Sequence, residues 1–245
     1  MSRPQVIAHR GASAQAPENT LAAFRRALAL GVDAVELDVH LSADGEPVVL
    51  HDSIVDRTTD GTGLVRDLAL AALRRLDAGR WFGEAFAGER IPTLAEALDL
   101  LRGVRVIVEI KNGPIYYPTI AERVVAVTRA VGHPAVTISS FDHPVLLEVR
   151  RADPAADTAV LFMGRPVDPV ALATAAGARR LHAHWMWVTA DMVAMAHQAA
   201  LAVEVWPVDD PVHMAHVAAL GVDGIITSYP DRLQAVLTGR RADVR

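Results

Sequence analysis

The sequence contains no cysteine, which excludes disulfides, thiolate nucleophiles and zinc sites with cysteine ligands. Any bound metal must use oxygen or imidazole ligands, and the lack of cysteine fits a reducing, cytoplasmic location. Aromatic residues make up only 5% of the chain. No window reaches about 18 uncharged apolar residues, so we expect no transmembrane segment. The few residues before Val6 leave no room for a signal peptide with its long apolar segment.

The sequence also lacks an excess of positive charge. Its 24 Lys and Arg residues against 29 Asp and Glu give a formal net charge of −5. Because no basic field exists to hold nucleic acid or an anionic membrane, we expect a small-molecule partner and no nucleic acid. The oligomeric state stays open. With 245 residues, 51% of them hydrophobic, the chain can bury one large core, and we predict a single domain over residues 1–245.

Short β-branched runs alternate with Ala- and Leu-rich segments of helical period, which is typical of βα units around a parallel sheet. The candidate strands are residues 5–9, 34–40, 48–51, 105–111, 135–140, 158–162, 180–184, 202–206 and 224–227. This is one strand more than a barrel of eight needs, and residues 41–47 are too few for a parallel crossover. We therefore predict an α/β fold, a (β/α)8 TIM barrel, with a β-hairpin after strand 2 and a small insertion at about residues 53–92.

Turn and cap residues add local detail. If Asp44-Gly45 is a two-residue turn, Asp38 lies opposite His51 in the hairpin. Asn19 is a candidate N-cap for the first helix. The run Thr93-Leu94-Ala95-Glu96 has the pattern of a capping box. Residues 238–245 have no apolar stripe and are predicted to be a frayed tail.

Charged side chains alternate along the second strand, where Glu36, Asp38 and His40 share one face. Inside a barrel such carboxylates would be buried charges that need a cation. Glu109 and Lys111 share a face late in the strand at 105–111, the position where barrel active sites are built. One rim would then collect His9, Arg10, Glu36, Asp38, His51, Glu109 and Lys111.

These residue types indicate phosphodiester chemistry. Three carboxylates without cysteine favour Mg²⁺ or Ca²⁺. Arg10 and Lys111 suit an anionic group such as phosphate. His9 and His51 could serve as general acid and general base near neutral pH, although the sequence leaves open which is which. The metal would polarise the phosphoryl group, one imidazole would activate the attacking oxygen, and the other would protonate the leaving alkoxide.

An ordered set of motifs closely resembles the glycerophosphodiester phosphodiesterase family. They are Ile7-Ala8-His9-Arg10-Gly11-Ala12, Pro17-Glu18-Asn19-Thr20, Glu36-Leu37-Asp38-Val39, Asp44-Gly45, Pro47-Val48-Val49, His51-Asp52, Asp56-Arg57-Thr58-Thr59, Ile91-Pro92-Thr93-Leu94, Val108-Glu109-Ile110-Lys111, Ser140-Phe141-Asp142 and Gly224-Ile225-Ile226-Thr227. The resemblance implies a barrel enzyme that releases sn-glycerol 3-phosphate and an alcohol with the help of Mg²⁺ or Ca²⁺. It assigns acid/base roles to His9 and His51, metal binding to Glu36, Asp38 and Glu109, and phosphate binding to Arg10 and Lys111.

Two motifs depart from the family pattern, namely Trp206-Pro207-Val208-Asp209 and Thr227-Ser228-Tyr229-Pro230. They put the specificity for the alcohol in doubt more than the chemistry. Trp206 is a candidate wall of the substrate cleft. His182, His184, Trp185 and Trp187 could line that cleft or fill the barrel.

Two other functions are open from the sequence. A phospholipase D acting on lysophospholipids would use the same cluster and would need an apolar surface, for which Ile115-Tyr116-Tyr117-Pro118 is the candidate. A barrel that binds phosphate without turnover is the non-enzymatic alternative. A degenerate binder of that kind should have lost at least one acid, base or ligand, and this chain has all of them.

Overall fold

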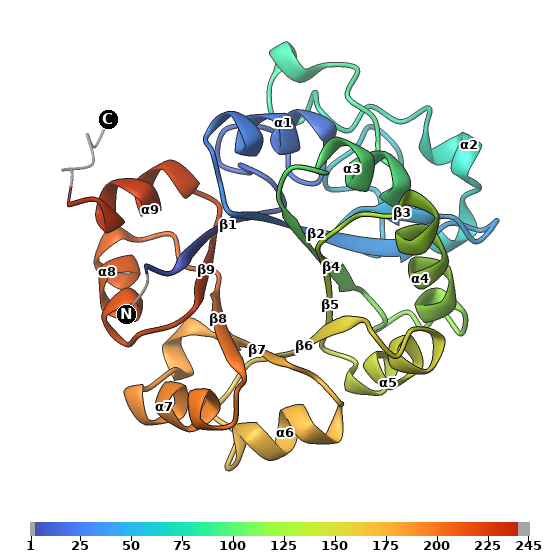
Figure 1. Ribbon diagram of the computed structural model, residues 1–245. Coiled ribbons are helices and arrows are strands. Elements are labelled where there is room, and N and C mark those ends of the chain that lie inside the picture. Colours follow the sequence, from blue (N-terminus) through green and yellow to red (C-terminus); the bar gives the residue numbers. More distant parts are fainter. Residues whose placement is uncertain (1–2, 240–245) are drawn as a thin grey trace.

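The computed structural model describes residues 3–239, and in them a closed barrel of parallel strands is surrounded by helices (Figure 1). The strands are β1 (Gln5–His9), β2 (Ala34–Leu41), β3 (Pro47–Val49), β4 (Arg105–Ile110), β5 (Val136–Ser140), β6 (Asp157–Phe162), β7 (Arg180–His184), β8 (Ala202–Trp206) and β9 (Gly224–Thr227). Strand β1 pairs in parallel with both β2 and β9, which closes the ring of eight. Strand β3 pairs antiparallel with β2 outside that ring. The predicted barrel with its added hairpin is confirmed.

Helices follow the barrel strands and cover the outside of the ring (Figure 1). They are α1 (Leu21–Ala29), α3 (Leu94–Leu100), α4 (Ile120–Val131), α5 (His143–Ala152), α6 (Pro169–Ala175), α7 (Ala190–Gln198), α8 (Pro211–Ala219) and α9 (Pro230–Leu237). The short helix α2 (Leu70–Leu73) and the 3-10 turns η1 (Val65–Asp67) and η2 (Glu84–Phe86) lie between β3 and α3, away from the ring, and a third 3-10 turn, η3 (Trp185–Trp187), follows β7. Val35, Leu37 and Val39 of β2 are buried in the main core between strands and helices. The same alternation turns the charged side chains of β2 toward the barrel interior. Among residues 3–239, no helix is both apolar enough and long enough to cross a membrane.

The predicted register of the hairpin is wrong by one residue. Val39 pairs with Val49 and His40 with Val48, so Asp38 lies opposite Leu50 and not opposite His51. The cause is the turn, which has three residues where two were expected. The backbone N–H of Gly45 donates to the backbone carbonyl oxygen of Ser42 at 3.0 Å. Gly45 itself adopts a left-handed φ of 79°, the arrangement of a three-residue hairpin loop.

The cap predicted for α1 is also wrong by one residue. The hydroxyl of Thr20, not the side chain of Asn19, accepts the N–H of Ala23 at 3.3 Å. Asn19 instead has a φ of 58° and turns its amide inward to Asp38. The capping box of Thr93 and Glu96 at the start of α3 is confirmed. Of the tail predicted to be frayed, residues 240–245 lie outside the described residues.

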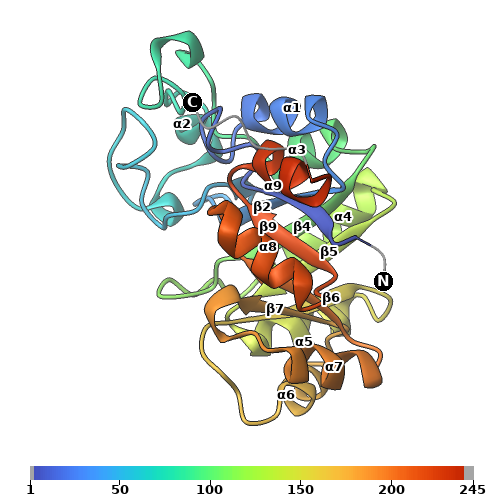
Figure 2. The same ribbon diagram turned by 90° about the vertical axis from the view of Figure 1, so that its left-hand side faces the viewer.

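Residues 53–92 form the predicted insertion. It has a small core of its own, in which Val55, Val65 and Leu73 pack against Val48 and Leu50 of the hairpin. Figure 2 shows that this segment projects at the end of the barrel opposite the start of β1. The insertion therefore stands beside the carboxyl ends of the barrel strands, where the predicted site residues lie.

Candidate active site

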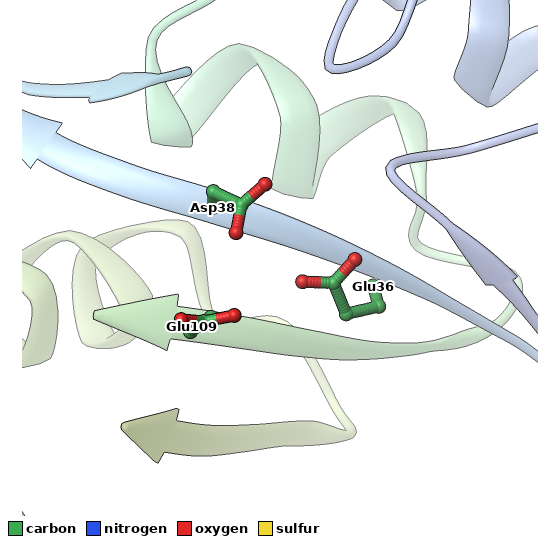
Figure 3. Close-up of side chains that lie close together, drawn as sticks. All are labelled: Glu36, Asp38 and Glu109. Carbon is green, nitrogen blue, oxygen red and sulfur yellow. The ribbon is translucent and has the colours of Figure 1, made fainter. Parts of the chain in front are cut away.

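Three carboxylates meet inside the barrel. Glu36 and Asp38 come from β2, Glu109 comes from the neighbouring β4, and Asp38 pairs with Glu109 in register. Figure 3 shows the three carboxyl groups turned toward a common space. One oxygen from each lies within 4.8 Å of the others, and all three side chains are buried. The structure thus brings together the three residues predicted to bind a metal.

Three buried carboxylates this close together cannot all be ionised without a nearby positive charge. Burial raises the pKa of Glu109 to about 7, and the charge of Asp38 adds to that rise. Burial, with Asp38 and Glu109 as neighbouring charges, raises the pKa of Glu36 well above its usual value. Burial also acts on Asp38, but Lys111 and Arg10 outweigh it and hold the pKa of Asp38 low. A divalent cation would let all three carboxyl groups ionise together.

The two predicted phosphate-binding cations lie against these carboxylates. The Lys111 Nζ is 3.1 Å from the Asp38 Oδ1 and 2.6 Å from the Glu109 Oε1. The Arg10 Nε is 3.2 Å from the Asp38 Oδ2, and the backbone N–H of Arg10 donates to the Glu36 Oε2 at 3.0 Å. The buried Asp38 Oδ1 and Glu109 Oε1 have these ion pairs but no hydrogen bond of good geometry. These two buried oxygens, together with the carboxylate of Glu36 within 4.8 Å, fit a hard divalent cation.

His9 ends β1 and lies beside Glu36 in register. Burial lowers the pKa of His9 to about 3, with the Arg10 charge adding to the effect, so this imidazole is neutral at pH 7. Together with Glu36, Glu109 and Trp206, His9 lines a small cavity of about 20 Å³. His9 is therefore a neutral base placed next to the carboxylate trio.

His51 follows β3 and reaches the same region from the hairpin side. Burial lowers its pKa, while the nearby Asp38 carboxylate acts in the opposite direction. The Nδ1 of His51 is 2.6 Å from the Asp52 Oδ1, which leaves Nε2 as the free nitrogen. The backbone oxygen of His51 lies 3.0 Å from the Nε2 of His40, whose Nδ1 is 3.1 Å from the Tyr117 hydroxyl. Although the predicted register is wrong, the site does include His51.

A chain of ion pairs connects the two sides of the site, and the sequence analysis assigned no role in it to Asp52 or Arg57. Arg57 bonds to the carboxylates of Asp52 and Glu18, and Glu18 in turn accepts a hydrogen bond from Arg10 at 2.9 Å. Asn19 donates to Asp38 at 2.8 Å. The insertion thereby reaches the barrel through Arg57. Asp52 and Arg57 both belong to motifs that carry the family resemblance, His51-Asp52 and Asp56-Arg57-Thr58-Thr59, and this is the signal that could have identified them.

Trp206 closes the site on the β8 side. Its Nε1 donates to the His182 oxygen at 3.0 Å, and its ring contacts those of Phe141 and His184 edge-on. His182 is buried and fills the barrel interior. The two motifs that depart from the family pattern meet here, because Asp209 accepts hydrogen bonds from the hydroxyl of Thr227 and the N–H of Ser228.

Comparisons with known proteins agree on one family. A model described as the glycerophosphoryl diester phosphodiesterase family matches residues 9–232. The chain is 42% identical over 231 residues to a glycerophosphodiester phosphodiesterase of Caldanaerobacter subterraneus, covering 93% of this chain and 95% of the relative. A solved Oleispira antarctica phosphodiesterase in complex with the product sn-glycerol-3-phosphate has a TM-score of 0.89 and 32% identity, with 96% and 97% of the two chains covered. A glycerophosphodiester phosphodiesterase structure from Agrobacterium tumefaciens gives a TM-score of 0.83 at 31% identity, with 95% and 99% covered.

Proposed function

The chain belongs to the glycerophosphoryl diester phosphodiesterase family, and on that premise we propose that it hydrolyses glycerophosphodiesters to sn-glycerol 3-phosphate and an alcohol. The observation that carries the proposal is the buried trio of Glu36, Asp38 and Glu109 with His9 and His51 beside it. The substrate is a small water-soluble phosphodiester, such as a deacylated phospholipid. The cytoplasmic location expected from the cysteine-free sequence belongs to the same proposal, and cell fractionation would test it.

Glu36, Asp38 and Glu109 would hold Mg²⁺ or Ca²⁺, which polarises a phosphoryl oxygen when bound. Arg10 and Lys111 would bind the phosphate. With all five groups ionised the cluster carries one more negative than positive charge, so a divalent cation makes it attractive to a phosphodiester anion.

His9 and His51 would carry the protons. One imidazole accepts a proton from the attacking oxygen, and the other donates a proton to the leaving alkoxide. Because Asp52 engages the Nδ1 of His51, the transfer at this residue takes place at Nε2. The partly buried, neutral His9 can accept a proton on its imidazole.

The function is tested by incubating the purified protein with glycerophosphocholine in the presence of Mg²⁺, Ca²⁺ or EDTA. We expect release of sn-glycerol 3-phosphate with at least one cation and none with EDTA. If neither sn-glycerol 3-phosphate from glycerophosphocholine nor choline from lysophosphatidylcholine is released under any condition, enzymatic function is contradicted and a phosphate-binding protein is favoured.

Metal binding is tested separately by thermal unfolding. Mg²⁺ or Ca²⁺ should raise the Tm of the wild-type protein, because a ligand at about 100 times its Kd stabilises the folded state by about 2.7 kcal/mol. Glu109→Gln should lose most of that increase. Glu148→Gln, which changes an exposed carboxylate on α5, is the control and should keep it. An equal increase in all three proteins would place the cation elsewhere.

Lysophospholipid cleavage is the second candidate, and one observation favours it. Tyr116 and Met163 lie in loops after β4 and β6, and Met186 lies in the 3-10 turn η3 after β7; they are 69%, 69% and 61% exposed at the same end of the barrel. Of the segment 115–118, however, Tyr117 is buried and Ile115 packs against the core. Faster cleavage of lysophosphatidylcholine than of glycerophosphocholine would move the function to this candidate.

A further inference from the structure

An open groove of about 430 Å³ lies on the β4–β5 side of the carboxylate trio. Its walls include Glu109, Lys111, Asn112, Tyr116, Phe141 and Asp142. Because Glu109 and Lys111 belong to the candidate site as well, the groove is continuous with the place where the phosphate would bind. A substrate held there has room to extend across this groove.

Two aromatic rings stand exposed at the groove. Tyr116 is 69% exposed and Phe141 is 48% exposed. The Phe141 ring is oriented by Trp206, which it meets edge-on at 5.4 Å between centroids. An aromatic face that is both exposed and fixed in orientation can receive a cation through its ring quadrupole.

A carboxylate is fixed at the same groove. The Asp142 Oδ2 accepts a hydrogen bond from the Asn112 Nδ2 at 2.6 Å, and the Asn112 Oδ1 accepts the Tyr117 N–H at 2.7 Å. Within residues 3–239, Asp142 forms no ion pair, since Lys111 on the groove wall is engaged by Asp38 and Glu109. The groove thus offers one negative charge without a positive partner, next to two aromatic rings.

We propose that this groove binds the alcohol half of the substrate and selects alcohols that carry an ammonium or trimethylammonium group. The inference rests on the proposed function and specifies its substrate class. A cation there gains charge attraction from Asp142 and cation–π contacts from the ring faces of Tyr116 and Phe141, whereas a neutral polyhydroxy alcohol of similar size gains only hydrogen bonds to Asp142. An acyl chain is disfavoured, because it would shield the charged Asp142 carboxylate from water without supplying a positive charge to balance it.

The test compares kcat/KM for glycerophosphocholine and for glycerophosphoglycerol, whose alcohol is neutral. The wild-type ratio should favour glycerophosphocholine by about tenfold or more, since about 1.4 kcal/mol corresponds to tenfold. Asp142→Asn keeps an oxygen for Asn112 but loses the charge, and Phe141→Leu loses the ring. Each variant should lower the ratio at least threefold. Free choline should also inhibit cleavage of glycerophosphoglycerol competitively, and less strongly in Asp142→Asn.

Matched controls change the same residue types outside the groove. Trp81→Leu removes an exposed aromatic ring from the insertion, and Asp191→Asn removes an exposed carboxylate on α7; both should keep the wild-type ratio. A wild-type ratio near one, or a ratio unchanged in Asp142→Asn, overturns the inference while leaving the hydrolase function intact. An equal loss on both substrates also overturns it, because the groove would then hold the shared glycerol half. No hydrolysis of either substrate by the wild-type protein overturns the proposed function itself.

Discussion

At the scale of single residues, Asp52 determines which nitrogen of His51 faces the site. Its carboxylate lies 2.6 Å from Nδ1 and is itself held by Arg57. The hydrogen bond from Arg57 lowers the pKa of Asp52 to about 2, so the group stays ionised across the pH range of an activity assay. A permanently charged partner favours the tautomer with the proton on Nδ1 and keeps Nε2 free for proton transfer.

We predict that His51→Ala abolishes turnover, and that Asp52→Asn lowers kcat by about 10- to 100-fold, because the imidazole loses its orienting charge. The KM and the response of the Tm to metal should change little in either variant. The measurements are steady-state kinetics and thermal unfolding with and without the cation. Asp67→Asn, an exposed carboxylate in the same insertion, is the control. Normal activity in His51→Ala would remove His51 from the mechanism.

At the scale of elements, the insertion 53–92 depends on one carboxylate for much of its shape. The Asp77 Oδ1 accepts the N–H groups of Gly79 and Arg80 at 2.9 Å, and its Oδ2 accepts the N–H of Gly88 at 2.9 Å. Few residues of this segment are helical, so such contacts replace the regular backbone hydrogen bonds of a helix or strand. Since Arg57 belongs to the same segment, its order bears on the site.

We predict that Asp77→Ala loosens the insertion by about 1–3 kcal/mol while the barrel stays folded. Hydrogen exchange should accelerate at amides within 53–92 and remain slow in β4 to β9. Activity should fall modestly, because a less ordered insertion holds Arg57 less firmly against Asp52 and Glu18. Asp99→Ala, on the exposed face of α3, should leave exchange in the insertion unchanged. Acceleration spread evenly over the barrel strands would contradict a local role.

At the scale of the whole molecule, a buried charged network joins strands near the amino end of the barrel. Glu204 of β8 is fully buried and lies 2.8 Å from His182, 2.7 Å from Arg105 and 3.1 Å from Arg180. Burial alone would raise the pKa of Glu204, but the hydrogen bond and charge of His182, together with the two arginines, lower it to about 2. The network thus bridges β4, β7 and β8 across the barrel interior.

A lowered pKa in the folded state means that the ionised form of Glu204 contributes stability above pH about 4.5. That contribution declines as the pH falls from about 4.5 toward 2. We predict that Glu204→Gln is less stable than the wild-type protein at pH 7 by on the order of 3 kcal/mol. The difference should shrink below pH 4.5 when urea unfolding is followed at several pH values. If the chain is the single domain that we predict, urea unfolds it in one transition. A stability difference between the wild-type protein and Glu204→Gln that does not depend on pH would contradict the role of Glu204.

Much of this architecture was predictable, because hydrophobic alternation and turn residues are local signals. The strands at 5–9, 180–184, 202–206 and 224–227 have the predicted bounds, and Thr93 caps α3 as expected. The two local errors, in the hairpin register and in the cap of α1, both arose where neighbouring residues compete for one role. The hydrogen bond between Ser42 and Gly45 gives a turn one residue longer than predicted. The side chain of Asn19 donates to Asp38, and the hydroxyl of Thr20 caps α1 instead.

The sequence by itself determined the barrel, the family and the seven polar residues of the rim, because each was recorded in short motifs and in strand periodicity. Only the tertiary structure decided how these residues meet. Lys111 and Arg10 are paired with the carboxylates, Asp52 and Arg57 orient His51, and Phe141 and Asp142 face the groove beside Glu109. Such contacts join residues far apart in the chain, and their distances depend on how the strands and loops pack, which no local pattern specifies.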